Sequence, residues 1–232
     1  TDKQIVAAAR SVRNRSATRT FSAATRTLES AAAFDGLHPR SLAVASIRPV
    51  RRQRTINVVL PQLSLSTMFA GVKTALEIAI DLAARLDCPL RLVALTGRLS
   101  SKERKAIAEF LLHEYGERAN VVADVLESVE LPRTSIGTRD LWIATHWTTA
   151  HSLDVAGRLG VVDVRDVIYL IQDYEPGFVP WSTEFALARA TYHAGFHTIV
   201  NSAPLAAYLA TQESLTISRN AIFRPQLDLS RL

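Results

Sequence analysis

From residue 56 onward, hydrophobic positions follow two patterns that alternate along the chain. Short apolar runs rich in β-branched residues predict buried strands, at residues 56–60, 90–95, 120–125, 140–145, 166–172 and 198–201. Longer segments with apolar residues three or four apart predict helices, at residues 71–86, 100–115, 146–159, 181–192 and 204–211. Ser100 and Glu103 have capping-box spacing at the start of the second of these helices, and Gly116 is its predicted end.

The order of these elements predicts the fold class. Strands that alternate with helices need crossover connections, which place the strands parallel in one sheet. The strands are apolar throughout rather than at every second residue, as expected when helices cover both faces of the sheet. The sequence therefore predicts an α/β fold with a doubly wound, mostly parallel, Rossmann-like sheet.

Residues 1–54 differ from the rest of the chain in composition. Residues 2–34 lack Pro and Gly and are rich in Ala, which predicts a helix, and residues 35–39 interrupt it. Pro49 and the arginines after it predict a linker. Residues 1–54 carry 11 Lys and Arg against 3 Asp and Glu, a balance of +8, whereas the other 178 residues carry 16 against 19, a balance of −3. We therefore predict a basic helical arm and linker at 1–54 and the main domain at 55–225.

The basic arm has two interpretations. Its arginines suit peripheral contact with anionic lipid, a pyrophosphate lipid carrier or nucleic acid. Alternatively, it is a solvated helix that packs on its own domain through Ile5, Val12, Phe21 and Leu28. A nucleic-acid partner would give steeply salt-dependent binding. The chain has no nucleic-acid-binding motif, so we expect no such partner.

Composition limits the compartment and the cofactors. The single cysteine, Cys88, excludes an intrachain disulfide and a multi-cysteine metal site and fits a reducing compartment. The histidines lack metal-ligand spacing, so we expect no metal. No apolar run approaches the roughly 18 residues of a membrane span, and no signal-peptide pattern is present. These features predict a cytoplasmic protein or one bound peripherally to the inner face of a membrane.

Ligands of open parallel sheets bind at the carboxyl ends of the strands, which directs attention to three loops. The loop after the first strand, residues 61–71, has a single glycine, so it is neither a dinucleotide-binding fingerprint nor a P-loop. Ala70 and Gly71 lie where a helix begins, and the free N–H groups there favour an anion. We predict that they contact a substrate phosphate; the alternative is that Gly71 only begins the helix.

The loop after the fourth strand contains His146 and Trp147. A histidine at this edge is a candidate base or polar contact to substrate, and Trp147 a candidate substrate contact. The alternative is a structural histidine bonded within its own loop. Ser-His-Asp catalysis is not expected, because the chain has no G-x-S-x-G motif.

Residues 172–182, after the fifth strand, combine carboxylates with aromatic rings, as sugar recognition requires. Carboxylates accept hydroxyl hydrogen bonds, and rings cover the apolar faces of a sugar. The predicted substrate contacts in this loop are Tyr174, Glu175, Phe178 and Trp181. Asp173, at the end of the strand, is the predicted base that removes the proton of the acceptor hydroxyl. Alternatively, the rings pack the loop down, the carboxylates cap the next helix, and Trp181 belongs to the core.

This loop also carries a family resemblance. Residues 171–178, together with 180–182 and Glu184, resemble the corresponding segment of WsaF-like rhamnosyltransferases, which are bacterial family 4-type glycosyltransferases of GT-B architecture. Residues 56–61, 71–79 and 142–150 are also similar, and the resemblance extends over about residues 56–225.

The resemblance implies two Rossmann-like domains facing each other across a cleft, with the acceptor held mainly by the N-terminal one. It implies transfer of L-rhamnose from dTDP-L-rhamnose to a glycan or lipid-linked glycan acceptor, with the nucleotide-sugar as co-substrate and no metal or other cofactor. Asp173 and Tyr174 would lie in the cleft and Gly71 near the donor phosphates. Residues 226–232 would begin the crossover to a C-terminal donor domain, so we expect no turnover by this chain alone. The alternative function is a non-catalytic sugar- or nucleotide-binding α/β module.

Overall fold

The computed structural model describes residues 42–68 and 70–223. The helix predicted at residues 2–34, the interruption at 35–39 and the predicted crossover at 226–232 lie outside the described residues. Within the described residues, no helix combines the length and apolar character that crossing a membrane requires.

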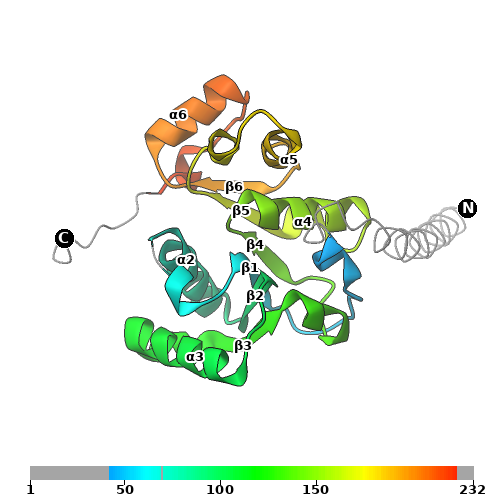
Figure 1. Cartoon of the computed structure of the whole chain (residues 1–232), viewed down its shortest axis with the longest axis vertical. Helices are drawn as coiled ribbons and strands as arrows, with labels where there is room; N and C mark the ends of the chain where they lie inside the picture. The colour runs from blue at the N-terminus through cyan, green and yellow to red at the C-terminus, as the bar shows by residue number, and fades with distance from the viewer. Residues whose placement is uncertain (1–41, 69, 224–232) are drawn as a thin grey trace, which may run out of the picture.

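Six parallel strands form one sheet in the order β3-β2-β1-β4-β5-β6 (Figure 1). The bounds of the strands are β1 Ile56–Gln62, β2 Leu90–Thr96, β3 Val122–Glu127, β4 Leu141–Ala144, β5 Val167–Ile171 and β6 His197–Val200. Each strand pairs in parallel with its neighbour in the sheet. The predicted strands and their parallel arrangement are therefore confirmed.

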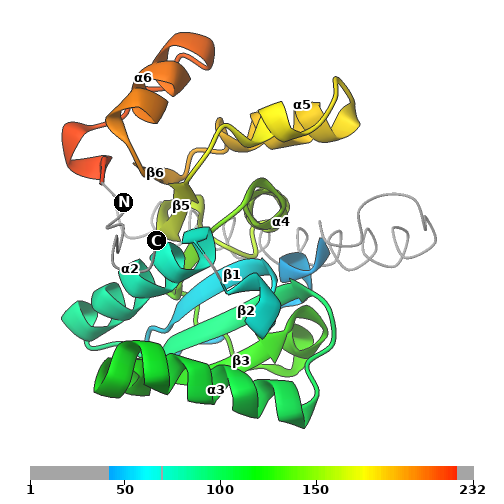
Figure 2. The ribbon, with the colours of Figure 1, turned by 60° about the vertical axis from the view of Figure 1, so that its left-hand side comes forward.

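Within residues 42–68 and 70–223, an α-helix follows each strand except β3. The bounds of these helices are α2 Ala70–Leu86, α3 Ser101–Tyr115, α4 Trp147–Arg158, α5 Thr183–Thr191 and α6 Ala203–Gln212. Figures 1 and 2 show α2 and α3 grouped on one side of the sheet and α4 on the other, with α5 and α6 beside β5 and β6. The doubly wound α/β fold is thus confirmed, and it is Rossmann-like.

Burial on both faces explains why the strands are apolar throughout. Ile143 and Leu170 pack into a cluster with α2 and α3, whereas Ala144 and Tyr169, their neighbours in the same strands, pack into the cluster that contains α4. Successive side chains of a strand point to opposite faces, so a sheet covered twice needs apolar residues at every position.

The described part of the predicted linker packs against the domain. Val44 and Ile47 are buried in the cluster that contains α4; Val44 begins the 3₁₀ helix η2, Val44–Ser46, and Ile47 follows it. Val50 pairs with Gly137 in an isolated parallel bridge, and the guanidinium of Arg52 donates to the carbonyl of Ser135. These contacts continue the core because the segment supplies apolar side chains before its arginines.

A buried polar network joins the amino ends of three strands. The carboxylate of Asp140 accepts hydrogen bonds from the backbone N–H groups of Thr55 and Gly137, at 3.0 and 2.9 Å, and from the amide of Asn57 at 3.3 Å. Arg91 donates to Asn57 Oδ1 at 2.8 Å. This network connects β1, β2 and the turn before β4 at the edge of the sheet opposite the predicted site.

Candidate functional site

The strand order places a topological switch point between β1 and β4. The crossovers from β1 and β2 lead to one side of that point and those from β4 and β5 to the other, so loops separate at the carboxyl ends of β1 and β4 and leave a crevice where ligands of such sheets bind. The loop after β1, His146 after β4 and Asp173 after β5 all emerge at this edge. The predicted site residues therefore come from adjacent strands.

Gly71 lies in the first turn of α2, against the end of β5. Gln172 Nε2 donates to the carbonyl oxygen of Gly71 at 3.0 Å. A Cβ atom at Gly71 would come within 3.2 Å of the Gln172 amide nitrogen and oxygen, closer than ordinary van der Waals contact. Glycine at this position therefore lets α2 approach β5. The phosphate contact of Ala70 and Gly71 stays a prediction.

His146 is the N-cap residue of α4. Its Nδ1 accepts a hydrogen bond from the backbone N–H of Thr148 at 3.3 Å and lies 2.9 Å from the Thr148 hydroxyl. Because Nδ1 accepts, a neutral His146 ring carries its proton on Nε2. The half-buried ring is thus bonded within its own loop, which agrees with the alternative of a structural histidine. A catalytic role for His146 stays a prediction.

Trp147 and Glu175 face the interior and contact each other. Glu175 is 4% exposed, and its carboxylate accepts hydrogen bonds from the backbone N–H of Trp147 and from the Tyr169 hydroxyl. Burial raises the pKa of Glu175 to about 8. Trp147 is itself buried. Both residues are therefore buried, and Glu175 joins the loop after β5 to the start of α4. Contact of Trp147 and Glu175 with substrate stays a prediction.

Asp173, by contrast, is exposed. Its Oδ1 accepts from the backbone N–H of Tyr174 at 2.7 Å. The carbonyl of Asp173 lies 3.4 Å from the Tyr192 hydroxyl, which also accepts the N–H of Glu175 at 3.2 Å. The backbone on both sides of Tyr174 is therefore held from α5, while the Asp173 carboxylate remains at the surface, as a base for an incoming hydroxyl requires.

Tyr174 is half-buried and is held by Glu213, which follows α6. Its hydroxyl donates to Glu213 Oε1 at 2.7 Å, and its ring packs edge-on against Tyr208 with the centroids 5.0 Å apart. Burial and the bond to Glu213 raise the pKa of Tyr174 to about 12. The hydroxyl therefore stays protonated at neutral pH and serves as an anchor for the loop.

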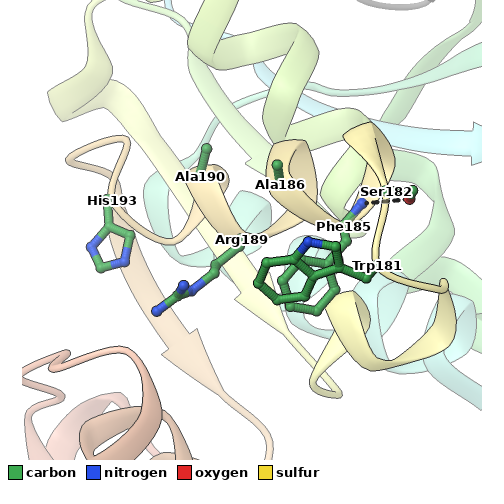
Figure 3. Close-up of a pocket in the computed structure, with 7 residues that line it drawn as sticks. All are labelled: Trp181, Ser182, Phe185, Ala186, Arg189, Ala190 and His193. Carbon is green, nitrogen blue, oxygen red and sulfur yellow. Dashed lines mark hydrogen bonds between the residues drawn. The ribbon is translucent and has the colours of Figure 1, made fainter.

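Phe178 and Trp181 are on the surface, with 65% and 85% of their area exposed. The alternative that places Trp181 in the core is wrong, because α5 begins only at Thr183, with Ser182 as its N-cap, and Trp181 lies outside the helix. Figure 3 shows the indole lying over the ring of Phe185. Contact of Phe178 and Trp181 with substrate stays a prediction that their exposure permits.

Sequence reasoning missed several residues that shape this edge. Asn201, after β6, donates to the carbonyl of Gln172, and the Thr145 hydroxyl donates to the carbonyl of Val59 at 2.8 Å. Glu213 was missed because nothing in the sequence relates a carboxylate after α6 to Tyr174, 39 residues earlier. Gln172 and Asn201 had a signal, since both are polar residues directly after a strand. Within the described residues, no cluster of His, Cys, Asp or Glu is placed to hold a metal ion.

This strand order, with helices on both faces of the sheet, defines a doubly wound α/β domain of the Rossmann-like class. Residues 55–202 match the family model described as WsaF, N-terminal domain, and the chain belongs to this family. The match contains all six strands and every predicted site residue.

A relative extends the comparison. The chain is 35% identical, over 89 residues, to the O-antigen biosynthesis protein RfbC of Myxococcus xanthus. The aligned stretch is 38% of this chain but only 6% of that protein, so the chain corresponds to a small part of this relative.

Proposed function

We propose that this chain is the acceptor-side domain of a glycosyltransferase. Membership of the WsaF N-terminal domain family supports this proposal, as does similarity to a protein named for O-antigen biosynthesis. In the specific form of the proposal, L-rhamnose passes from dTDP-L-rhamnose to a glycan or lipid-linked glycan acceptor. A C-terminal domain of the same enzyme supplies most of the donor site.

One observation carries the proposal to the level of residues. Asp173 is an exposed carboxylate at the carboxyl end of β5, on a loop held from three sides through Tyr174, Glu175 and the Tyr192 hydroxyl. A rigid loop keeps the base in place without ordering it at each turnover. His146, at the end of the neighbouring strand β4, is the second proposed polar residue of this site.

The proposed transfer inverts the anomeric carbon. The acceptor hydroxyl oxygen bonds to that carbon while the bond from the carbon to the phosphate oxygen breaks, and dTDP leaves with the electron pair. Asp173 takes the proton of the attacking hydroxyl. The N–H groups of Ala70 and Gly71 in the first turn of α2 stabilise the charge of the leaving diphosphate.

Asp173→Asn tests the assignment of the base. Amide replacement keeps the shape but cannot take a proton, so we expect kcat to fall by about 100-fold or more. The measurement is nucleotide release by the full-length enzyme with a panel of nucleotide-sugars, in which dTDP-L-rhamnose should react fastest.

Glu109→Gln is the matched control, since Glu109 is an exposed carboxylate on α3, far along the chain from the loop after β5. An Asp173→Asn enzyme as active as Glu109→Gln would contradict the role of Asp173. Binding of a nucleotide-sugar without any turnover would favour the alternative of a non-catalytic binding module.

A further inference from the structure

The outer face of α5 carries a pocket that no step of the proposed transfer uses. Trp181 and Phe185 form its apolar end, with ring centroids 4.6 Å apart and ring planes tilted by 34°. Arg189 and His193 form its polar end, further along the helix (Figure 3). The pocket has a volume of about 400 Å³, which lies in the range of small-molecule sites.

The charge of the pocket is largely balanced from within the protein. Arg189 Nε lies 3.0 and 2.8 Å from the two carboxylate oxygens of Glu213, and His193 Nε2 lies 3.4 Å from Oε2. Both side chains remain about half exposed. The polar end therefore offers hydrogen-bond donors without a strong net charge, which suits a neutral ligand better than an anion.

An aromatic surface beside such donors matches the chemistry of a sugar. A large exposed ring covers the C–H face of a pyranose, and neighbouring N–H groups bond its hydroxyls. A protein partner would need a far larger apolar area, because stable interfaces bury on the order of 1,000 Å² or more. Here the apolar part consists of little more than two rings and two alanines.

The pocket is also continuous with the proposed catalytic loop. Asp173 and Trp181 lie near the two ends of residues 172–182, which connect β5 to α5. Glu213 bonds both the Tyr174 hydroxyl in that loop and Arg189 in the pocket. A ligand that extends along this loop would therefore meet both places, and a glycan chain is such a ligand.

We propose that the Trp181 pocket, defined by Trp181, Phe185, Arg189 and His193, is a remote acceptor subsite. It binds sugar units of the acceptor glycan beyond the unit whose hydroxyl reacts at Asp173. This inference rests on the proposed function, which supplies the glycan acceptor. Its consequence is a preference for long acceptors over short ones.

The indole N–H signals of the 232-residue chain provide a direct binding test. Of the three tryptophans, Trp142 and Trp147 are buried and only Trp181 is exposed, so the first two are internal references. The probes are hexasaccharides of L-rhamnose, of mannose and of N-acetylglucosamine. We expect at least one of them to shift the Trp181 signal in a saturable way and to leave the Trp142 and Trp147 signals in place.

Trp181→Ala should weaken the binding of that hexasaccharide by about tenfold, as measured by calorimetry. Leu112→Ala is the control, because Leu112 is an exposed apolar residue on α3. Absence of a Trp181 shift with all three hexasaccharides overturns the proposal. It is also overturned if Trp181 instead mediates self-association, seen as a dimer in sedimentation that Trp181→Ala abolishes.

Assays of the full-length enzyme separate this inference from the proposed function. Trp181→Ala should raise KM for a long acceptor several-fold more than it raises KM for a monosaccharide acceptor. If Asp173→Asn keeps full activity while the Trp181 signal still shifts with glycan, the catalytic proposal fails and the subsite stands. If the enzyme transfers sugar but Trp181→Ala has no effect on long acceptors, the subsite fails alone.

Discussion

Asp173 and Glu175 are two carboxylates separated by one residue, and the fold gives them different environments. Asp173 is exposed at the end of β5, whereas Glu175 is turned into the interior between Tyr169 and the start of α4. From the sequence, Asp173 is the predicted base and Glu175 a predicted substrate contact, so both are expected to face the substrate. Only the path of the backbone after β5 decides which one faces solvent.

The buried position of Glu175 makes stability depend on pH. Its folded-state pKa, about 8, lies above the ordinary value of 4.5. The folded protein therefore binds more protons between these values, and the free energy of unfolding falls as pH rises from about 4.5 to about 8. The amide of Glu175→Gln is neutral throughout this range. We therefore expect the free energy of unfolding of this variant to fall less than that of wild type, by on the order of 3 kcal/mol.

Urea denaturation of wild type and Glu175→Gln, at about pH 5 and about pH 8.5, measures the difference. Glu109→Gln, at an exposed carboxylate, should follow the wild-type pH dependence. If the free energy of unfolding of Glu175→Gln and of wild type changes equally with pH, the pKa of Glu175 is not raised in the folded protein.

Among the elements, the helix starts differ in how far the sequence determines them. α3 begins with the predicted capping box: Ser100 Oγ accepts from the N–H of Glu103 at 3.3 Å, and the Glu103 carboxylate accepts from the N–H of Ser100 at 2.8 Å. α4 begins with His146 instead, and the Thr149 hydroxyl accepts the N–H groups of Thr145 and His146. The sequence pattern did not predict this cap at the start of α4.

Ser100→Ala tests the contribution of the capping box. Loss of the hydroxyl leaves the N–H of Glu103 to water, and we expect the free energy of unfolding to fall by about 1 kcal/mol. Ser100→Asp, which can also cap, should restore most of the loss. Ser101→Ala, one residue later, is the control, and an equal effect of both alanine variants in urea denaturation would argue against the cap.

At the scale of the whole molecule, the carboxyl and amino edges of the sheet differ in what they hold. The carboxyl edge carries the candidate site, while the amino edge holds the Asp140 network that joins β1, β2 and the turn before β4. A Cβ at Gly137 would lie 2.2 Å from Asp140 Oδ1, so glycine is needed for the turn that brings this carboxylate inward. The network holds these strands in register at the amino edge, and this register sets the positions of the strand ends at the candidate site.

Asp140→Ala should destabilise the domain strongly, by about 3 kcal/mol or more. The change removes the acceptor for two buried N–H groups and leaves Arg91, itself 3% exposed, paired with the half-exposed Asp124. The midpoint of thermal or urea unfolding gives the measurement. If Asp140→Ala does not fold, Asp140→Asn, which keeps one acceptor oxygen, should fold with an intermediate loss.

Asp124→Ala is the comparison, because Asp124 contacts the same arginine from a half-exposed position. We expect a loss below about 1 kcal/mol for this exposed partner. If the Asp140 and Asp124 substitutions lower the free energy of unfolding equally, burial of the network contributes little to stability.

The sequence by itself determined the fold and selected the edge of the sheet that carries the candidate site. Hydrophobic periodicity is a local property, since it reports which faces of a strand or helix meet the core. It located all six strands of the sheet along the chain. The rule for parallel sheets then selected the loops after β1, β4 and β5. The residues 171–178 also carried the family resemblance that the match over residues 55–202 confirms.

Only the tertiary structure decided which side chain of a chosen loop faces outward and what holds it there. Glu175 is buried against the start of α4, Trp181 lies outside the core, and the Tyr174 hydroxyl donates to Glu213. These outcomes depend on contacts between segments far apart in the chain, which local pattern does not encode. A loop without periodicity takes its orientation from the elements packed around it.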